Sequence, residues 1–206
     1  IQVVSTAGSL DNAKRLQNKT ADLALVQNDI QATAEVRSIT AIHPELLHFL
    51  CHKDSRIQTL HDLTGKKVAV GLKGSGTERF TMELLGYFGI DPSTFQLIHL
   101  PINAAANQLV AGELSAILYL TGLGNSAVKK AIGSGNVKFA QLAMPPKSGT
   151  PTATWNDANL WAETLSTGFK IHYPHVSPHT IPLMAYRGVD SQPGHPHQPI
   201  ATVGVK

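Results

Sequence analysis

The stretch "GLKGSGTERF", from Gly71 to Phe80, holds the residue types best suited to chemistry in this chain. Glycines and hydroxyl residues follow an apolar run there and precede a helical pattern. Glycine lets a backbone come close to a ligand, and the first amides of a helix are unpaired and attract an anion. Ser75 and Glu78 also have the S-x-x-E spacing of a capping box, so Ser75 can instead cap its own helix. Both interpretations stay open from the sequence.

Two glycine motifs resemble nucleotide-binding loops but are incomplete. A P-loop requires a lysine after its second glycine, and Thr77 stands at that place. The run "GLGNSA" at 122–127 fits the G-x-G-x-x-A dinucleotide pattern, which also requires an acidic residue about 20 positions later. No Asp or Glu occurs from Leu114 through Asn156. We therefore expect no nucleotide and no other cofactor.

The sequence also predicts neither a metal site nor a catalytic residue. The histidines of the last third lie in a proline-interrupted stretch without an HExxH pattern, which is typical of surface loops. No G-x-S-x-G elbow occurs, and the single cysteine, Cys51, lies in an apolar run as a small buried residue would. The histidines considered are His172, His175, His179, His195 and His197.

Composition indicates a folded soluble protein, and the scattered charges argue against nucleic acid as a partner. The chain has 206 residues, of which 42% are hydrophobic and 15% charged. Its net charge is +3, but the basic residues form separate pairs such as Lys66/Lys67 and Lys129/Lys130, and no basic stripe is visible. No apolar run reaches the ~20 residues that a membrane-spanning helix needs.

The elements that must position these loops follow an alternating strand and helix pattern. Such alternation predicts crossover units and a parallel sheet, that is, an α/β fold. A first helix is expected around Ala13 and Leu16, and Gly89 is placed to end the second. Strands are expected at 1–4, 21–28, 45–53, 67–72, 95–101, 114–121, 136–143 and 199–206, and the later helices at 77–89, 103–113 and 124–135.

Four polar loops follow the carboxyl ends of these expected strands. They are 5–9, 27–29, 71–77 and 121–125, all rich in Gly, Ser, Thr, Asn or Gln. In an open parallel sheet, ligands bind beyond the carboxyl ends of the strands. None of the loops holds a nucleophile beside a base. We therefore predict a cleft that grips a small carboxylate through neutral donors. Tyr119, at a strand end, can either pack in the core or line that cleft.

Three long runs of the sequence resemble one known family, and the resemblance covers nearly the whole chain. The runs are "STAGSLDNAKRLQNKTADLALVQNDI", "HPELLHFLCHKDSRIQTLHDLTGKKVAVGLKGSGTE" and "LVAGELSAILYLTGLGN". They resemble the TAXI solute-binding proteins, which are NMT1-like, type II periplasmic binding proteins and the receptors of TRAP (tripartite ATP-independent periplasmic) transporters. Compared with the usual pattern of that family, we expect this chain to lack a first strand and the terminal helices.

The resemblance implies two α/β lobes that close over a ligand. Lobe I is expected at 1–63 plus 199–206 and lobe II at 64–198. The implied function is a periplasmic, monomeric, non-enzymatic receptor that passes a small carboxylate or amino acid, such as glutamate or glutamine, to a TRAP permease. The alternative is the sensor domain of a membrane-bound signalling protein. The ligand-binding residues implied are Ser9, Gln27, Asn28, Gly74, Ser75, Gly76, Thr77, Tyr119 and Gly122.

Overall fold

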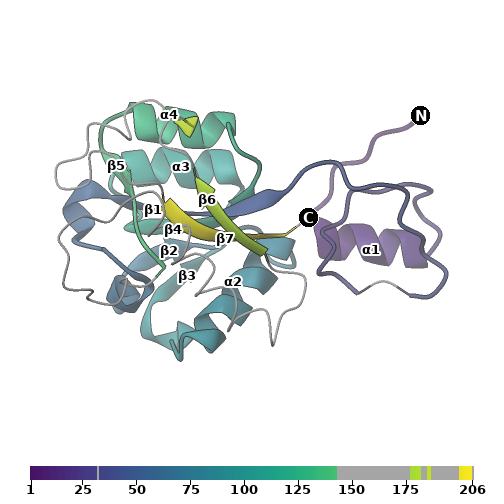
Figure 1. Cartoon of the computed structure of the whole chain (residues 1–206), viewed down its shortest axis with the longest axis horizontal. Helices are drawn as coiled ribbons and strands as arrows, with labels where there is room; N and C mark the ends of the chain where they lie inside the picture. Colours follow the sequence, from purple (N-terminus) through teal and green to yellow (C-terminus); the bar gives the residue numbers. More distant parts are fainter. Residues whose placement is uncertain (32, 143–176, 182–184, 187–199, 206) are drawn as a thin grey trace.

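The structure is a computed structural model that describes residues 1–31, 33–142, 177–181, 185–186 and 200–205. It consists of one mixed sheet with helices on both faces, and an N-terminal portion, residues 1–44, that extends away from the sheet (Figure 1). The helices are α1 (Ser9–Gln17), α2 (Gly76–Tyr87), α3 (Ile102–Val110) and α4 (Ser126–Gly133), and short 3-10 turns occupy Lys53–Ser55, Leu60–Leu63 and Pro92–Thr94. The strands are β1 (Glu45–His52), β2 (Lys67–Ala69), β3 (Gln96–Ile98), β4 (Ala116–Thr121), β5 (Val137–Phe139), β6 (Ser177–Ile181) and β7 (Ile200–Val205).

The sheet is mixed, so the expectation of a parallel sheet is correct for only part of it. The strand order is β3-β2-β4-β1-β7-β6, with β5 also paired to β1. Strands β3, β2 and β4 run parallel, as their helical crossovers require. Strand β1 runs antiparallel to β4, β5 and β7. No helix leads from β1 to β2; only 3-10 turns do, which is why this connection does not follow the crossover rule.

Both faces of β1 are buried, which explains its nearly continuous apolar sequence. Leu47, Phe49 and Cys51 pack in one cluster with side chains of α2. Leu46 and Leu50 pack in a second cluster with side chains of α3 and α4. Figure 1 shows the corresponding layers, with α3 and α4 above the sheet and α2 below it. The α/β fold class predicted from the sequence is confirmed.

Two of the expected strands do not form. Residues 1–4 and 21–28 contain the β-branched or apolar runs of strands, but the structure gives them no strand pairing. Val3, Leu23 and Leu25 are exposed, with 70% or more of each residue accessible. A run of apolar residues becomes a strand only where a partner satisfies its backbone groups, and the described residues offer these two runs none.

The remaining expectations for the elements are met within a few residues. Helix α2 ends at Tyr87, and Gly89 follows in the left-handed conformation with a φ of 66°. Strand β6 was not expected, because its sequence, "SPHTI", carries a proline and no alternating pattern. The proposed lobe boundary at 63/64 falls between β1 and β2, two strands that both pair with β4 in one sheet.

Candidate ligand-binding pocket

A cavity of about 270 Å³ lies where the N-terminal portion meets the sheet. Loops that are far apart in the sequence contribute to its wall, including parts of three of the four loops selected from the sequence, 5–9, 27–29 and 71–77. The fourth loop, 121–125, does not line the cavity, although Tyr119 and Leu120 of the strand before it do. A smaller hollow of about 130 Å³ between α3 and α4 is lined mostly by alanine and asparagine side chains and contains none of the predicted site residues. The larger cavity is lined by Ala7, Gly8, Ser9, Gln27, Glu45, Leu72, Ser75, Gly76, Thr77, Pro101, Ile102, Tyr119 and Leu120.

Three helices begin at this cavity. Ser9 starts α1, Gly76 starts α2 and Ile102 starts α3, and all three residues are in the wall. The first amides of a helix lack intrahelical partners and carry the positive end of the helix dipole. Neither α1 nor α3 has a side chain capping these amides. Because the three positive ends converge, the cavity is suited to an anionic group.

Ser75 caps α2, as its spacing to Glu78 predicts. Its Oγ accepts a hydrogen bond from the Glu78 backbone amide at 3.1 Å. The Glu78 carboxylate accepts from the Gly74 amide at 2.5 Å and lies 2.7 Å from Nε2 of His99. This carboxylate is therefore held on the loop and does not line the cavity. Capping and pocket formation, which the sequence presents as alternatives, occur together.

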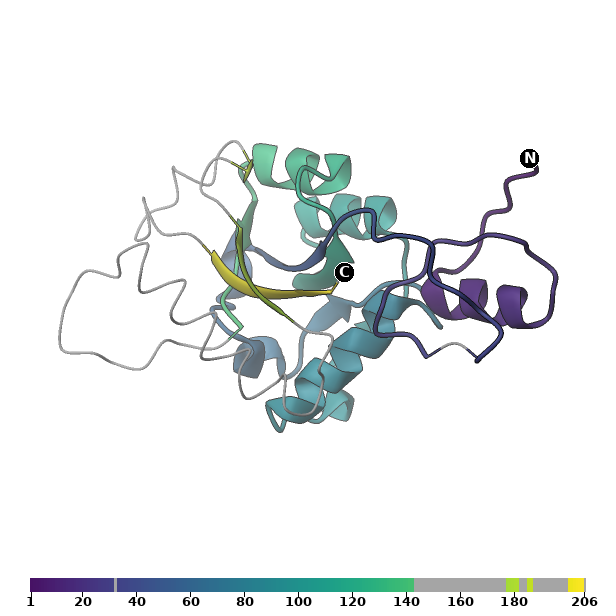
Figure 2. The same cartoon turned by 45° about the vertical axis from the view of Figure 1, so that its right-hand side comes forward.

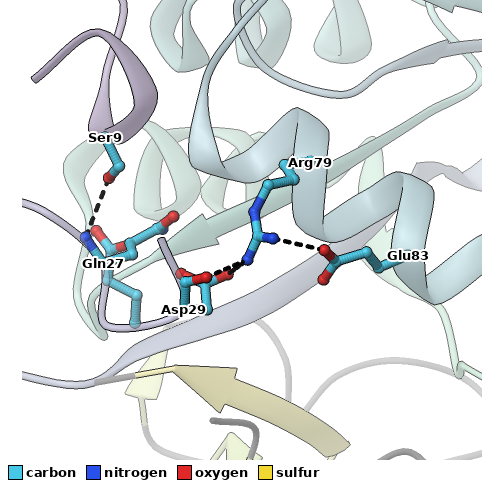
Figure 3. A network of polar contacts seen from close by, with 6 residues as sticks. Ser9, Gln27, Asp29, Arg79 and Glu83 are labelled. Atoms are coloured by element: carbon cyan, nitrogen blue, oxygen red, sulfur yellow. Dashed lines mark hydrogen bonds and ion pairs between the residues drawn. The ribbon is translucent and has the colours of Figure 1, made fainter. Parts of the chain in front are cut away.

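Gln27 is held by two hydrogen bonds. Its backbone amide donates to Oγ of Ser9 at 3.2 Å (Figure 3), and its side-chain Nε2 donates to a carboxylate oxygen of Glu45. Its Oε1 lies directly over Gly76, where an added Cβ would be only 1.6 Å away. Oε1 is buried and has no hydrogen-bond partner among the described residues. The side chain therefore presents an unused acceptor beside the cavity.

Tyr119 both packs in the core and lines the cavity. The residue is only 7% exposed, and its hydroxyl donates to the Leu100 carbonyl. Burial raises the pKa of its phenol, so the side chain stays neutral. Through the register of β1 with β4, Tyr119 lies opposite His48. The aromatic ring is thus a neutral, fixed part of the wall.

Three of the predicted site residues do not line the cavity. Asn28 is exposed, and Gly74 faces open space with nothing within 4 Å of an added Cβ. Gly122 lies against the ring of His43. These three remain predictions from the family resemblance. The six that the structure brings together are Ser9, Gln27, Ser75, Gly76, Thr77 and Tyr119.

Sequence reasoning missed Glu45, Pro101 and Ile102. Pro101 and Ile102 follow β3, so the rule about carboxyl ends of strands would have selected them had that loop been included. The rule does not cover Glu45, because Glu45 is at the amino end of β1. Because β1 is antiparallel to β4, its amino end lies beside the carboxyl end of β4. Glu45 is the only charged residue among the described residues of the wall.

Several amides in and after the "GLGNSA" loop are hydrogen-bonded within the protein. The Gly124 amide donates to the Tyr186 hydroxyl at 3.0 Å. Asn125 caps α4, with its Oδ1 accepting from the amides of Ala127 at 2.9 Å and Val128 at 3.3 Å. The glycine pattern here therefore leads into a helix that caps its own first turn.

Two other reactive side chains lie in the core, away from the cavity. Cys51 is fully buried, as expected, and burial raises the pKa of its thiol to about 11. Burial lowers the pKa of His48 to about 4, so its imidazole is neutral. Of the five histidines considered from the sequence, His179 is in β6, and the other four, His172, His175, His195 and His197, lie outside the described residues.

Comparison with protein families identifies the chain. Residues 1–145 match the model of the NMT1-like family. The chain therefore belongs to the NMT1-like family, as the sequence resemblance implied. The described helices include none with the length and hydropathy required to cross a bilayer.

Several solved structures are partly similar. The aliphatic sulphonate binding protein SsuA of Escherichia coli is 20% identical, with 64% of this chain and 45% of that chain covered and a TM-score of 0.40. A mutant of ArgBP from T. maritima is 15% identical, with 68% and 57% covered and a TM-score of 0.47. The SsuA of Xanthomonas axonopodis pv. citri bound to MOPS is 16% identical, with 82% and 61% covered and a TM-score of 0.47. The chain spans less than two thirds of the length of each.

Proposed function

We propose that this chain is the ligand-binding part of an extracytoplasmic solute-binding protein. It captures a small carboxylate or amino acid, glutamate-like or glutamine-like, and delivers it to a membrane permease of the TRAP type. The protein acts as a monomeric receptor without catalytic activity. We assign it to the TAXI class of receptors, because three runs of its sequence between Ser5 and Asn125 resemble those proteins.

One observation carries the proposal: three helix starts and three of the loops selected from the sequence share one cavity. An anionic group fits against the starts of α1, α2 and α3, because first amides of helices supply neutral donors. A donor or cationic group fits beside Glu45 and the unused Oε1 of Gln27, which accept hydrogen bonds. The wall thus suits a metabolite that carries both kinds of group.

The chemistry of the wall favours binding over catalysis. The described residues that line the cavity include no histidine, lysine or cysteine. The hydroxyl of Ser75 already accepts a hydrogen bond from its own helix, and the Tyr119 hydroxyl is bonded to Leu100. Both hydroxyls are thus used in structural hydrogen bonds, and the described wall supplies no imidazole as a general base.

Isothermal titration calorimetry with a chemical panel tests the proposal. The panel contains L-glutamate, L-glutamine, L-arginine, glutarate and an alkanesulfonate, which separate the need for an anion from the need for a cation. We expect at least one amino acid to bind with a micromolar or lower dissociation constant, about 8 kcal/mol of binding free energy. Absence of heat with every compound would count against the receptor function.

Substitution of Gly76 tests the same cavity from inside. In Gly76→Ala the new Cβ would be 1.6 Å from Oε1 and 2.6 Å from Cδ of Gln27, so this flexible side chain must leave its position. We expect binding to weaken about tenfold or more, which is about 1.4 kcal/mol per factor of ten. Thermal unfolding should change little, because alanine suits a helical backbone.

Gly86→Ala is the matched control, since Gly86 is in the same helix and an added Cβ there meets nothing within 4 Å. This control should bind like the wild type and gain roughly 0.5–1 kcal/mol of stability. Equal binding by the two variants would remove Gln27 from the proposed site.

A further inference from the structure

The turn that carries Gln27 is held by an ion pair outside the cavity. Asp29 and Ile30 are 6% and 8% exposed, in a stretch of the chain that is otherwise largely exposed. The Ile30 amide donates to the Gln27 carbonyl at 3.2 Å and closes the turn. Nη2 of Arg79, from α2, then donates to the Asp29 carboxylate at 2.9 Å and to the Asp29 carbonyl at 2.6 Å. The guanidinium thus contacts both the side chain and the backbone of the turn (Figure 3).

The second arm of Arg79 fixes the guanidinium to its own helix. Nη1 donates to a carboxylate oxygen of Glu83 at 2.7 Å, one helical turn further along α2. The Asp29 side chain is only 5% exposed, and its Oδ1 has no hydrogen-bond partner among the described residues. A buried carboxylate is stable only while a partner compensates its charge. The position of the turn therefore depends on Arg79.

Neither Arg79 nor Asp29 is among the residues that line the cavity. Arg79 is three residues after Gly76, the residue over which the Gln27 side chain lies. The turn is thus tied to α2 at Asp29 and to Ser9 and Glu45 at Gln27. One rigid helix supplies both the surface under Gln27 and the ion pair that holds the turn carrying it.

We propose that Asp29 and Arg79 are positioning residues that set the ligand affinity of the cavity by holding the 27–30 turn against α2. This inference rests on the proposed function. The ion pair acts through Gln27, which it keeps over Gly76 with its unused acceptor beside the ligand. It also joins the N-terminal portion to the sheet and its helices at a point next to the cavity.

The test measures affinity and local opening in the full chain for four variants. Asp29→Asn removes the charge of the turn, and Arg79→Met removes both contacts to it. Arg79→Lys keeps the positive charge. Asp54→Asn is the matched control, because the Asp54 side chain is 92% exposed and the residue lies outside the cavity wall and the turn. The probes are the five compounds of the calorimetric panel, and hydrogen–deuterium exchange is measured without ligand on peptides covering 21–31 and 102–121.

We expect Asp29→Asn and Arg79→Met to bind the panel compounds about tenfold more weakly. In metal sites, loss of a residue that only orients a ligand-contacting side chain lowers affinity by about 10- to 100-fold, and we take the lower value here. Exchange should become faster in 21–31 and stay unchanged in 102–121. Arg79→Lys should recover part of the affinity, and Asp54→Asn should bind like the wild type.

The proposal is overturned if Asp29→Asn and Arg79→Met bind and exchange like Asp54→Asn. It is also overturned if exchange rises equally in both peptides, since that would show a general loss of stability. If no panel compound binds the wild type, the receptor function fails, and the exchange of 21–31 alone decides whether the ion pair holds the turn.

Discussion

At the scale of single residues, His48 shows how the core uses a polar side chain. Its Nδ1 donates to the Leu46 carbonyl at 2.8 Å, since a carbonyl can only accept. Its Nε2 is then the acceptor, and it accepts a hydrogen bond from the Tyr186 hydroxyl at 2.8 Å. The same hydroxyl accepts from the Gly124 amide at 3.0 Å. One neutral imidazole thus links β1, the start of α4 and the segment that contains Tyr186.

This arrangement makes stability depend on pH. Burial lowers the pKa of His48 from 6.5 to about 4 in the folded protein, so between these pH values His48 is protonated in the unfolded chain and neutral in the folded one. The stability that the buried neutral His48 contributes is fully present above about pH 6.5 and is lost as the pH falls toward 4. We expect roughly 3 kcal/mol less free energy of unfolding across this window from His48 alone. Urea unfolding at pH 7 and pH 4.5 measures it.

The comparison that isolates this residue is His48→Gln, which keeps a donor and an acceptor but has no titration. Its stability should fall less between the two pH values than that of the wild type. Equal losses in the two proteins would assign the pH dependence to other groups.

At the scale of elements, α4 begins with a helix cap, Asn125, inside the run 122–127 that fits part of a dinucleotide-binding pattern. Asn125 accepts from two amides of the first turn, and its Nδ2 donates to Oγ1 of Thr121 at 2.9 Å. Asn125→Ala removes these bonds and should lower the free energy of unfolding by about 1 kcal/mol. Asn125→Asp keeps the acceptor for the helix and should lose less. Urea denaturation measures both, and an unchanged stability in Asn125→Ala would contradict the capping role.

The core elements could be predicted from the sequence because their apolar residues repeat at the period of a helix or fill a buried strand. Helices α2, α3 and α4 and strands β1 to β5 fall where their patterns place them. Residues 21–28 have a similar apolar pattern but find no partner strand among the residues that the structure describes, and pairing depends on the distant parts of the chain that a local pattern does not contain. Strand β6 exists through its pairing with β7, and its own residues give no strand signal.

At the scale of the whole molecule, the hydrophobic core forms without the N-terminal portion. Both hydrophobic clusters consist of residues from Leu46 onward. A chain that begins at Pro44 should therefore still unfold cooperatively. It should bind none of the panel compounds, because it lacks Ser9, Gln27 and the start of α1. Circular dichroism during heating and calorimetry check the two halves of this prediction, and loss of a cooperative transition would contradict the first.

The site was predictable where it follows the rule for parallel strands and was missed where the sheet changes direction. The loops at 71–77 and 121–125 leave the parallel strands β2 and β4, and residues of β4 and of the first loop reach the cavity. Glu45 reaches it from the amino end of an antiparallel strand, and strand direction is not encoded in a local pattern of residues. The unused acceptor of Gln27 and the ion pair of Asp29 also depend on distant contacts, so only the structure supplies them.

The antiparallel direction of β1 has a mechanical consequence. The chain enters the sheet at Glu45, in the wall of the cavity, while the N-terminal portion extends outward from that point, as the turned view in Figure 2 shows. The N-terminal portion is therefore joined to the sheet and its helices beside the cavity twice, by the chain at Glu45 and by the ion pair of Asp29 with Arg79. Any shift of this portion against the sheet would change the spacing between Ser9 and Gln27 and the wall residues Gly76 and Tyr119, so the cavity would change shape together with the junction.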